Sequence, residues 1–425
     1  MSLTKKPATG MKDILPEEMR IRDYCISVIE KTYESFGFLH IETPCVEHIE
    51  NLCSNQGGEN EKLIFKVMKR GEKLNIAEAK NENDLADAGL RYDLTLPLAR
   101  FYSNNQAQLP TPFKALQMGN VFRAERPQHG RFRQFMQCDI DILGEPGNLA
   151  ETELILATTT LLSKLQFSNF RVKINDRRIL KAMASYAGFD EDKTDAVFVI
   201  LDKMDKIGFD GVKEELISNG FDEAVVNKYM SLFDEMKKEN DETNISSLDF
   251  LNSKLEGFIE EGAIENLKDI FDSVEAAKSA DCALFFDPTL VRGMGYYTGT
   301  IYEIEMAELN CAVAGGGRYD RMIGKFTGNN TPACGFSIGF ERIITIMLEK
   351  GFKIPGESEK IAFLVEKGIN GERMGSIIKE ASALRNEGKV VLIARMNKNK
   401  KFQKETLTGQ GFTEFKDFYK EEMKF

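Results

Sequence analysis

The sequence has no tryptophan, three histidines and seven cysteines among its 425 residues. No two cysteines form a C-x-x-C pair, so we expect neither a structural zinc site nor a disulfide framework, and no metal-binding residues. A reducing cytoplasm is the expected compartment. The sequence also lacks any apolar run of about 18 residues, which argues against a membrane-spanning helix. Its first residues show no apolar segment of a secretory signal.

Two common nucleotide-binding signatures are missing as well. The sequence contains no G-x-x-x-x-G-K-[ST] loop, and no G-x-G-x-x-G follows a first strand. Any nucleotide site must therefore be of another kind. Apolar residues make up 42% and charged residues 29%, which excludes a disordered or fibrous protein and fits a globular chain of two to four domains.

The charge is unevenly distributed along the chain. The net charge is −11 and the pI about 5.2, which argue against a protein that coats nucleic acid nonspecifically. From Glu357 onward, however, 14 Lys and Arg stand against 11 Asp and Glu. A mildly basic end on an acidic body indicates a localised anionic partner.

Hydrophobic periodicity predicts a mixed α and β fold. Apolar residues at helical spacing predict an amphipathic helix over 17–36 that ends at Gly37. The next segment, 38–48, is interpreted as one strand, at a sheet edge because Pro44 cannot donate to a ladder. Period-two patterns at 113–123 and 131–144 predict a long antiparallel hairpin.

Further elements follow in the second half of the chain. Segments 150–165 and most of 177–280 are predicted to be helical, strands are expected at 298–306 and 311–315, and a glycine-rich turn then leads to a helix near Ile338. A linker at 351–360 precedes a small α/β unit, whose predicted elements are a strand at 361–365, a helix at 371–387, a strand at 390–394 and a lysine-rich segment.

Polar residues concentrate on one face of the hairpin's second strand. Alternation places Arg133, Phe135, Gln137, Asp139 and Asp141 together. Two acids and an amide make a poor core surface but a good floor for a polar pocket. Upstream, Asp93 and Thr95 stand two apart, and on a strand they would point the same way and could hold an ammonium group. The alternative is an ordinary polar surface strand.

Three further clusters carry candidate chemistry. The hairpin tip holds several arginines and His129, which suit phosphate recognition, although a solvated loop is the alternative. Segment 292–300 combines three glycines with Tyr296 and Tyr297, so it is either a ligand-binding loop or a turn with packed tyrosines. The triple glycine 315–317 leaves room for a flat ring, and Arg342 on a following helix could bind an anion.

Together these segments resemble class II aminoacyl-tRNA synthetases, and specifically the histidyl-tRNA synthetase family. Gly37-Phe-x-x-Ile41-x-Thr43-Pro44 is similar to motif 1 of the class, Phe122-Arg123-x-Glu125-Arg126 to motif 2, and Gly339-Phe340-Glu341-Arg342 to motif 3. Arg292-Gly-x-x-Tyr296-Tyr297-Thr298-Gly299 resembles a histidine-specific element. The resemblance covers essentially the whole chain. It implies an α+β fold: an antiparallel sheet flanked by helices, with a helical insertion and a small C-terminal α/β domain.

The resemblance implies a role for each matched residue. Arg123 would hold the ATP α-phosphate and the substrate carboxylate, Glu125 the adenine, and Arg342 the γ-phosphate of a bent ATP. Arg292 would stabilise charge on the α-phosphate, so Arg292 and Arg123 are the expected catalytic residues. The histidine site would bind the α-amino group and read the imidazole. Its expected members are Asp93, Thr95 and Gln137 for the amino group, Asp141 and Tyr297 for the ring, and Tyr296 beside them.

Partners and domain boundaries follow from the same resemblance. The substrates would be L-histidine, ATP with Mg²⁺, and tRNA-His, used by a homodimer without membrane contact. Segments 1–176 and 281–350 would form the catalytic domain, 177–280 an insertion, and 360–425 a short anticodon-binding-like domain. No editing domain is expected, because polar groups that read an imidazole reject other side chains strongly. Four lysines are candidate tRNA contacts, unless they form a solvated helix: Lys398, Lys400, Lys401 and Lys404.

The sequence departs from the family pattern at three places. Position 295 is Gly where many relatives carry Asp, and Asp93 and Asp141 stand where some relatives have Glu. The segment after Lys360 is short for an anticodon-binding domain. Two alternatives remain: a histidine-sensing regulatory subunit of ATP phosphoribosyltransferase, and a class II synthetase for another amino acid. The first has no need of Arg292 and Arg342, and the tyrosines and acidic strand face argue against the second.

Overall fold

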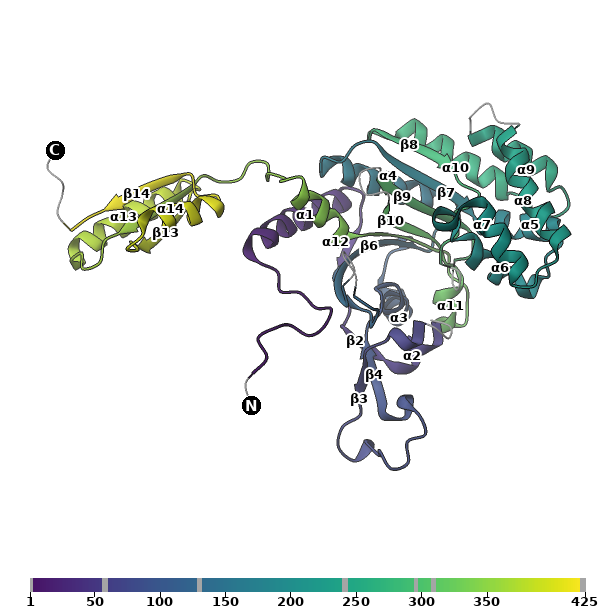
Figure 1. The fold of residues 1–425 in the computed structure, drawn as a ribbon, viewed down its shortest axis with the longest axis horizontal. Helices are drawn as coiled ribbons and strands as arrows, with labels where there is room; N and C mark the ends of the chain where they lie inside the picture. Colours follow the sequence, from purple (N-terminus) through teal and green to yellow (C-terminus); the bar gives the residue numbers. More distant parts are fainter. Residues whose placement is uncertain are drawn as a thin grey trace. The chain divides into compact units, whose positions relative to one another are not determined.

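The computed structural model describes residues 3–55, 60–127, 132–238, 244–293, 297–306 and 311–420. The chain forms two compact units (Figure 1). The first comprises Met1–Ile14 and Arg22–Lys350, and the second Leu15–Ile21 and Gly351–Phe425. No helix within these described ranges has the length and apolar character needed to cross a membrane.

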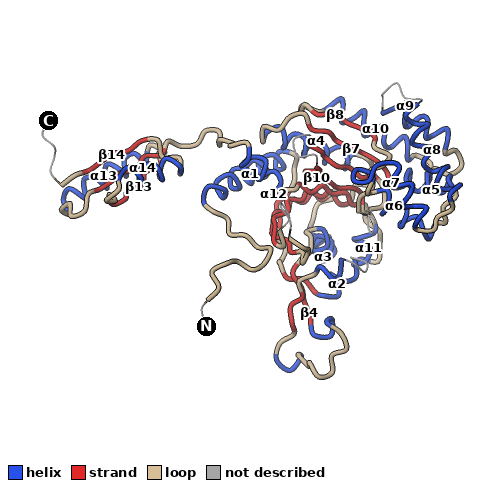
Figure 2. Tube along the Cα trace, in the orientation of Figure 1, coloured by secondary structure: helices blue, strands red, loops and turns tan. Residues whose placement is uncertain are grey.

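A large, mostly antiparallel sheet organises the first unit, which confirms the predicted fold class. Among the described residues its strand order is β1-β5-β6-β11-β10-β9-β7-β8, and only the pairs β1–β5 and β7–β8 are parallel. Figure 2 shows these strands side by side between helices. The bounds are β1 (Leu39–Ile41), β5 (Phe113–Phe122), β6 (Gln134–Leu143), β7 (Phe170–Asp176), β8 (Cys282–Phe286), β9 (Thr300–Met306), β10 (Cys311–Arg318) and β11 (Ala333–Ile338).

The predicted hairpin is confirmed and forms two neighbouring strands of this sheet, between β1 and β11. Strands β5 and β6 pair in one continuous antiparallel register, from Phe113 opposite Leu143 to Phe122 opposite Gln134. Alternation then sends Cys138 and Ile140 into the core, where both are fully buried. The loop that joins the strands includes residues 128–131, which lie outside the described residues, so the expectation for His129 is not addressed.

Helices cover both faces of the sheet. Helix α1 (Pro16–Ser35) confirms the amphipathic prediction, and Cys25 on its buried side lies 3.3 Å from Met347 of α12 (Phe340–Glu349). Helices α4 (Leu149–Lys164) and α12 pack on the central strands. On the other side of the sheet (Figure 1), α3 (Thr95–Asn105) packs against α11 (Arg321–Thr327) through Leu98, Tyr102 and Ile323.

Three local predictions are wrong. Segment 38–48 is not one strand: β1 belongs to the large sheet, and β2 (Val46–His48) pairs in a second sheet with β4 (Ala86–Leu90), which also pairs with β3 (Lys66–Met68). Pro44, which has no N–H to donate, separates the two strands. Residues 315–317 form no turn but lie inside β10, paired with β11. Asp93 and Thr95 lie on no strand, because Thr95 is the first residue of α3.

The helical content predicted for 177–280 is confirmed. These helices leave the sheet after β7 and return at β8, its parallel neighbour, so the helical block grows from one edge of the sheet. Its members are α5 (Arg177–Ala187), α6 (Thr194–Leu201), α7 (Met204–Ser218), α8 (Glu223–Lys238), α9 (Asn244–Lys254) and α10 (Ala263–Ala277). Helix α2 (Ile49–Asn55) lies elsewhere, next to β4.

The second unit is a small parallel α/β structure, as its sequence predicts. Its strand order is β13-β12-β14. The lysine-rich segment folds as a helix, and the third strand is not predicted from the sequence. The bounds are β12 (Lys360–Val365), α13 (Gly371–Asn386), β13 (Val390–Arg395), α14 (Lys400–Gly409) and β14 (Glu414–Phe418).

The first unit also contains short 3-10 turns. They are η1 (Asn60–Leu63), η2 (Gly71–Lys73), η3 (Glu82–Leu85), η4 (Gln106–Gln108) and η5 (Glu191–Lys193).

Candidate active site

Two adjoining cavities open on the face of the sheet that carries the polar side chains of β6. The large cavity has a volume of about 400 Å³ and the smaller one about 80 Å³. They share Arg123, Gln137, Tyr297 and Ser337 as lining residues. Because three carboxylates line the smaller cavity, we call it the acidic pocket. The two form one continuous site with chemically different halves.

Three arginines line the large cavity, as expected. The Arg123 guanidinium lies between the rings of Tyr92 and Phe135, at 4.3 and 5.0 Å from their centroids, and its Nε donates to the Tyr92 carbonyl at 3.1 Å. Arg342, in the first turn of α12, donates to the carbonyl of Ala312. Flat guanidinium groups held in this way are preorganised to bind anions.

The third arginine, Arg292, pairs with Glu303 of β9. Its side chain is about half exposed, whereas that of Glu303 is 9% exposed. Burial raises the pKa of Glu303, and the Arg292 charge opposes that rise. Sequence reasoning missed Glu303. Its position in the cavity follows from the pairing of β9 with β10, in which Glu303 lies opposite Gly315, another lining residue.

Glu341 also lines the large cavity; the motif 3 match includes it but gives it no role. Its carboxylate accepts from both terminal nitrogens of Arg22, at 2.6 and 2.9 Å, and from the N–H of Met136 at 3.1 Å. It therefore ties α1 and α12 to β6. The predicted adenine contact, Glu125, also lines the large cavity, and its carbonyl accepts from Arg133 at 2.9 Å.

The acidic pocket contains Asp93, Asp139 and Asp141. Asp141 is 3% exposed, and one of its oxygens accepts from the Tyr319 hydroxyl at 2.6 Å. Its other oxygen is buried and has no hydrogen-bond partner within the described part of the chain. Burial raises the pKa of Asp141 to about 7, against the effect of the Tyr319 bond. Such a carboxylate favours a ligand that brings a donor or a positive charge.

Asp139 strengthens the negative character of this pocket. Strand alternation predicts it on this face but gives it no role. Burial first, and then the Asp141 charge, raises the pKa of Asp139 well above its usual range. The Ser337 hydroxyl donates to Asp139, and Gln137 Nε2 donates to the same hydroxyl at 3.2 Å. Gln137 Oε1 is buried and unbonded among the described residues, so it remains an acceptor for a ligand.

A short loop and the first residue of α3, not a strand, present Asp93 and Thr95. Arg91 is buried beneath it and donates to the Thr43 carbonyl at 2.6 Å, while Gln117 of β5 donates to the Leu94 carbonyl at 3.1 Å. Asp93 itself accepts from the N–H of Leu96 at 3.1 Å. The loop and the start of α3 therefore bring both predicted residues to the acidic pocket, although by different backbone geometry from that expected.

Tyr297 lies at the junction of the two cavities. A side chain at Gly293 would place its Cβ 2.0 Å from the Tyr297 ring, and Gly293 also has a φ of +56°, which favours glycine. The glycine is therefore needed for the ring to lie where it does. The predicted contact Tyr296, and Gly295 beside it, lie outside the described residues.

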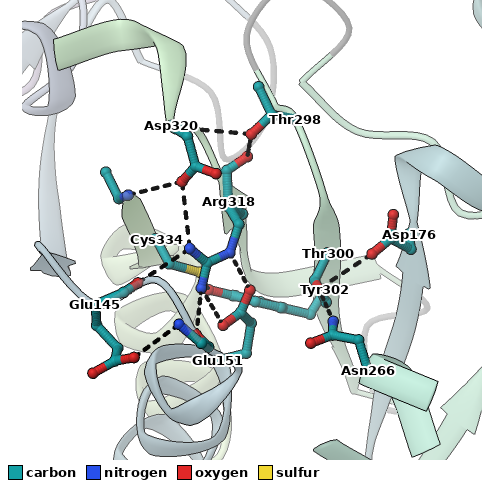
Figure 3. Close-up of polar contacts among 12 residues, drawn as sticks. Glu145, Glu151, Asp176, Asn266, Thr298, Thr300, Tyr302, Arg318, Asp320 and Cys334 are labelled. Atoms are coloured by element: carbon teal, nitrogen blue, oxygen red, sulfur yellow. Dashed lines mark hydrogen bonds and ion pairs between the residues drawn. The ribbon is translucent and has the colours of Figure 1, made fainter. Parts of the chain in front are cut away.

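A buried arginine network fixes the segment that follows Tyr297 (Figure 3). Arg318 donates to both oxygens of Glu151 at 2.7 Å and to the Gly147 carbonyl at 2.7 Å. The Arg318 carbonyl in turn accepts from the N–H of Thr298 at 2.7 Å, and the Thr298 hydroxyl accepts from the N–H of Asp320 at 3.2 Å. The position of Tyr297 thus rests on a satisfied ion pair in the core.

The four lysines of the second unit behave differently from one another. Lys400 and Lys404 both donate to Asp417, at 2.9 and 3.1 Å, and Lys400 also donates to the Tyr419 hydroxyl. Lys398 and Lys401 are exposed. Two of the four predicted contacts are therefore engaged within the unit, and two face solvent.

An antiparallel sheet with arginines over one cavity and carboxylates in the next is the arrangement of a class II aminoacyl-tRNA synthetase. The family model described as Histidyl-tRNA synthetase matches residues 10–343, and the chain belongs to this family. A histidine–tRNA ligase of Leifsonia xyli is 39% identical over 96% of this chain and 94% of its own length. One from Christiangramia forsetii is 35% identical over 85% and 82%.

Solved structures agree with this assignment. The crystal structure of histidyl-tRNA synthetase from Nostoc sp. PCC 7120 is 26% identical, with a TM-score of 0.78, and the match covers 97% of this chain and 90% of that chain. A structure from Bacillus halodurans C, described as an ATP phosphoribosyltransferase regulatory subunit/histidyl-tRNA synthetase, is 19% identical with a TM-score of 0.75. At that identity it supports the fold alone.

Proposed function

We propose that this protein is an enzyme that activates L-histidine with ATP and then transfers the histidyl group to the 3′ end of tRNA-His. The observation that carries this proposal is the union of an arginine-lined cavity with a carboxylate-lined pocket. The arginine-lined cavity suits a triphosphate, and the carboxylate-lined pocket suits an amino acid with two basic groups. The family membership of the chain supports the same assignment.

In the proposed arrangement ATP occupies the large cavity. Arg123 binds the α-phosphate and the histidine carboxylate, Arg342 the γ-phosphate, and Glu125 the adenine. The histidine carboxylate attacks the α-phosphorus, and pyrophosphate leaves from the opposite side. Because this step joins two anions, cationic groups that hold them in line lower the barrier. Arg292, freed from Glu303, offsets the charge that develops on the α-phosphate.

The histidine side chain occupies the acidic pocket. Asp93, Thr95 and Gln137 bind the α-amino group, whereas Asp141 and Tyr297 read the imidazole, with Tyr296 as a further proposed contact. The unpaired oxygen of Asp141 supports this role, because a buried acceptor without a donor costs about 1–3 kcal/mol until a ligand supplies one. An amino acid without a ring N–H leaves that acceptor unpaired, and specificity of about 10⁴ or more follows.

Mg²⁺ is proposed to enter with the triphosphate. The residues present do not build a metal cage: no cluster of three or more candidate ligands occurs within the described ranges, and Glu303 and Glu341 are both paired with arginines. The ion therefore takes its ligands chiefly from phosphate oxygens and water. The protein contributes the arginines that position the same phosphates.

Assembly and tRNA contact complete the proposal. Segments 1–176 and 281–350 act as the catalytic domain of a cytoplasmic homodimer, with the motif 1 segment at its interface, and 177–280 is an insertion. Segment 360–425 binds the anticodon, for which exposed Lys398 and Lys401 are better placed than Lys400 and Lys404, whose ammonium groups pair with Asp417.

The test is a charging assay with the purified chain, ATP, Mg²⁺, labelled L-histidine and transcribed tRNA-His. We expect acid-precipitable label on tRNA-His and none on a tRNA for another amino acid. Histidine binding without charging would contradict the proposal and favour a histidine-sensing regulatory protein. The three arginines of the large cavity argue against that alternative, because a sensor has no phosphates to hold.

A further inference from the structure

A third cavity, of about 220 Å³, lies next to the active site. Tyr297 lines this cavity as well as the two cavities of the active site, so the three meet at one side chain. We call it the basic cavity because four of its residues are cationic. Its lining is Arg177, Arg178, Lys181, Ala182, Ser185, Phe258, Glu260, Tyr297, Thr298 and Arg321.

Helix α5 presents most of the positive charge. Arg177, Lys181 and Ser185 recur every four residues, so one face of the helix lines the cavity. Two of the arginines are fixed by carboxylates behind them. Asp176 caps the helix and pairs with Arg178 at 2.8 Å, and the buried Arg177 lies 3.5 Å from Asp195. These ion pairs hold the two arginine side chains in place and neutralise part of the positive charge of the cavity.

The remaining two cations have no such neutralisation. Lys181, on α5, and Arg321, at the start of α11, are exposed, and the side chain of neither makes a hydrogen bond or an ion pair with any other described residue. Glu260 is the one carboxylate among the described lining residues, and it lies 3.8 Å from Arg178. The cavity therefore holds excess positive charge on a chain whose net charge is −11.

An aromatic surface accompanies this charge. Phe258 is 50% exposed, which is unusual for a large apolar ring, and Tyr186 supports it edge to face with centroids 5.6 Å apart. Cations beside an exposed ring form the pairing that single-stranded nucleic acid uses, with phosphates on the cations and a base stacked on the ring. Free phosphate would use the cations but gain nothing from Phe258.

We propose that the basic cavity binds a backbone phosphate of the tRNA strand close to its 3′ end. Lys181 and Arg321 hold the phosphate from two sides, and Phe258 stacks on the adjoining base. The inference rests on the proposed function, since it names where that RNA substrate lies during transfer. Because the basic cavity and the large cavity share Tyr297, an RNA strand bound in the basic cavity is adjacent to the cavity where the adenylate forms.

The experiment separates RNA binding from the chemistry of activation. Lys181→Ala, Arg321→Ala and their double variant are compared with Lys164→Ala. This control removes an exposed lysine of α4 whose side chain makes no hydrogen bond or ion pair with another described residue. Each is assayed for histidine-dependent ATP–pyrophosphate exchange, which needs no RNA, and for tRNA-His charging. We expect the double variant to raise KM for tRNA about tenfold or more, because it removes charged hydrogen bonds to phosphate. Exchange should stay at the wild-type rate.

Two further readouts sharpen the test. The dependence of log KM for tRNA on log salt should weaken by about 0.7 for each phosphate that is no longer neutralised by a cation. The conservative single variant Lys181→Arg, with Arg321 unchanged, should retain wild-type charging. An unchanged KM and salt slope would overturn the inference, as would exchange and charging falling together, which would assign the cavity to the amino-acid site. Loss of inorganic pyrophosphate binding with normal charging would assign it to a free anion instead. Absence of exchange in the wild type would refute the proposed function itself.

Discussion

At the scale of single residues, the site depends on carboxylates held where their charge is unfavourable. Asp139 and Asp141 lie two residues apart on the face of β6 that lines the acidic pocket. Both are buried, and burial raises the pKa of both. Each therefore gains from a cationic or donor ligand more than an exposed carboxylate would. Arg123 and Arg342 in the adjoining cavity have the complementary property, because within the described residues their guanidinium groups donate to backbone carbonyls and not to carboxylates. Ligand binding resolves both imbalances at once.

Arg292→Ala should separate activation from histidine binding. If Arg292 acts on the charge that develops at the α-phosphate, its loss lowers the rate of adenylate formation about 10²–10³-fold. Histidine affinity, measured by calorimetry, should change by less than about threefold, since the pocket for the amino acid is intact. Arg171→Ala, which removes an exposed arginine lying over Phe285, is the matched control. An equal loss of rate and affinity would show that Arg292 serves binding instead.

Asp141→Asn should alter how stability depends on pH. The folded-state pKa of Asp141, about 7, lies above its unfolded value, so the folded protein binds the extra proton. Its stabilising contribution is full below about pH 4 and is lost as pH rises through 7. In urea unfolding, the free energy of unfolding of Asp141→Asn should therefore rise relative to that of the wild type between pH 5 and 7.5, by a few kcal/mol at most. Exposed Asp23→Asn should show no such gain, and a parallel pH dependence of the two variants would contradict the assignment.

At the scale of elements, the centre of the sheet depends on strands that approach closely. A Cβ at Gly316 of β10 would lie 2.0 Å from the Gly335 carbonyl oxygen of β11, whereas one at Gly315 would lie 3.6 Å from its nearest neighbour. The glycines therefore do more than open space for a ring. Gly316 lets β10 and β11 pair. The other edge of β11 pairs with β6, and that pairing places Ser337 opposite Asp139.

Gly316→Ala should destabilise the first unit by about 1–3 kcal/mol or more, because a backbone atom rather than a flexible side chain must move. Gly315→Ala is the matched control and should change stability by less than about 0.5 kcal/mol. Differential scanning calorimetry of the apo protein measures both. Equal thermal midpoints for the two variants would mean that the sheet relaxes around the added methyl group.

The Arg318–Glu151 pair should show the asymmetry of buried ion pairs. Arg318→Met leaves Glu151, which is 1% exposed, without its guanidinium and should cost about 3–5 kcal/mol. Arg318→Met combined with Glu151→Met removes the stranded charge and should recover part of that loss. Urea midpoints of the two proteins decide the matter, and a double variant less stable than the single one would contradict the prediction.

At the scale of the whole molecule, local pattern predicted those parts whose partners are close in sequence. The hairpin β5–β6 and the face that bears Gln137 and Asp141 follow from alternation and one turn. Ser337 and Tyr319 could not be predicted, because they meet β6 only through pairing across some 180 to 200 residues of chain. Strands β8 and β11 are absent from the sequence-based prediction because their short apolar runs show no clear period of their own. Strand β7 is absent too, although Phe170, Val172 and Ile174 alternate with polar residues and could have marked it.

The functional residues divide in the same way. Arg123, Arg292 and Arg342 could be proposed from the resemblance to family motifs, and the structure places all three at one cavity. Glu303 lies in no motif that marks it, and Glu341 lies in the motif 3 segment, which gives it no role. The structure pairs both with arginines. The basic cavity joins α5, α11 and the Tyr297 segment, which lie far apart in sequence, so only the fold reveals it.

The most direct test of the whole account is ATP–pyrophosphate exchange by the purified chain with Mg²⁺, each amino acid being added separately. The account predicts exchange with L-histidine and background with the others, because only an imidazole pairs with Asp141 in the acidic pocket while the arginines hold ATP. Exchange driven by a different amino acid, or none with any, would contradict it.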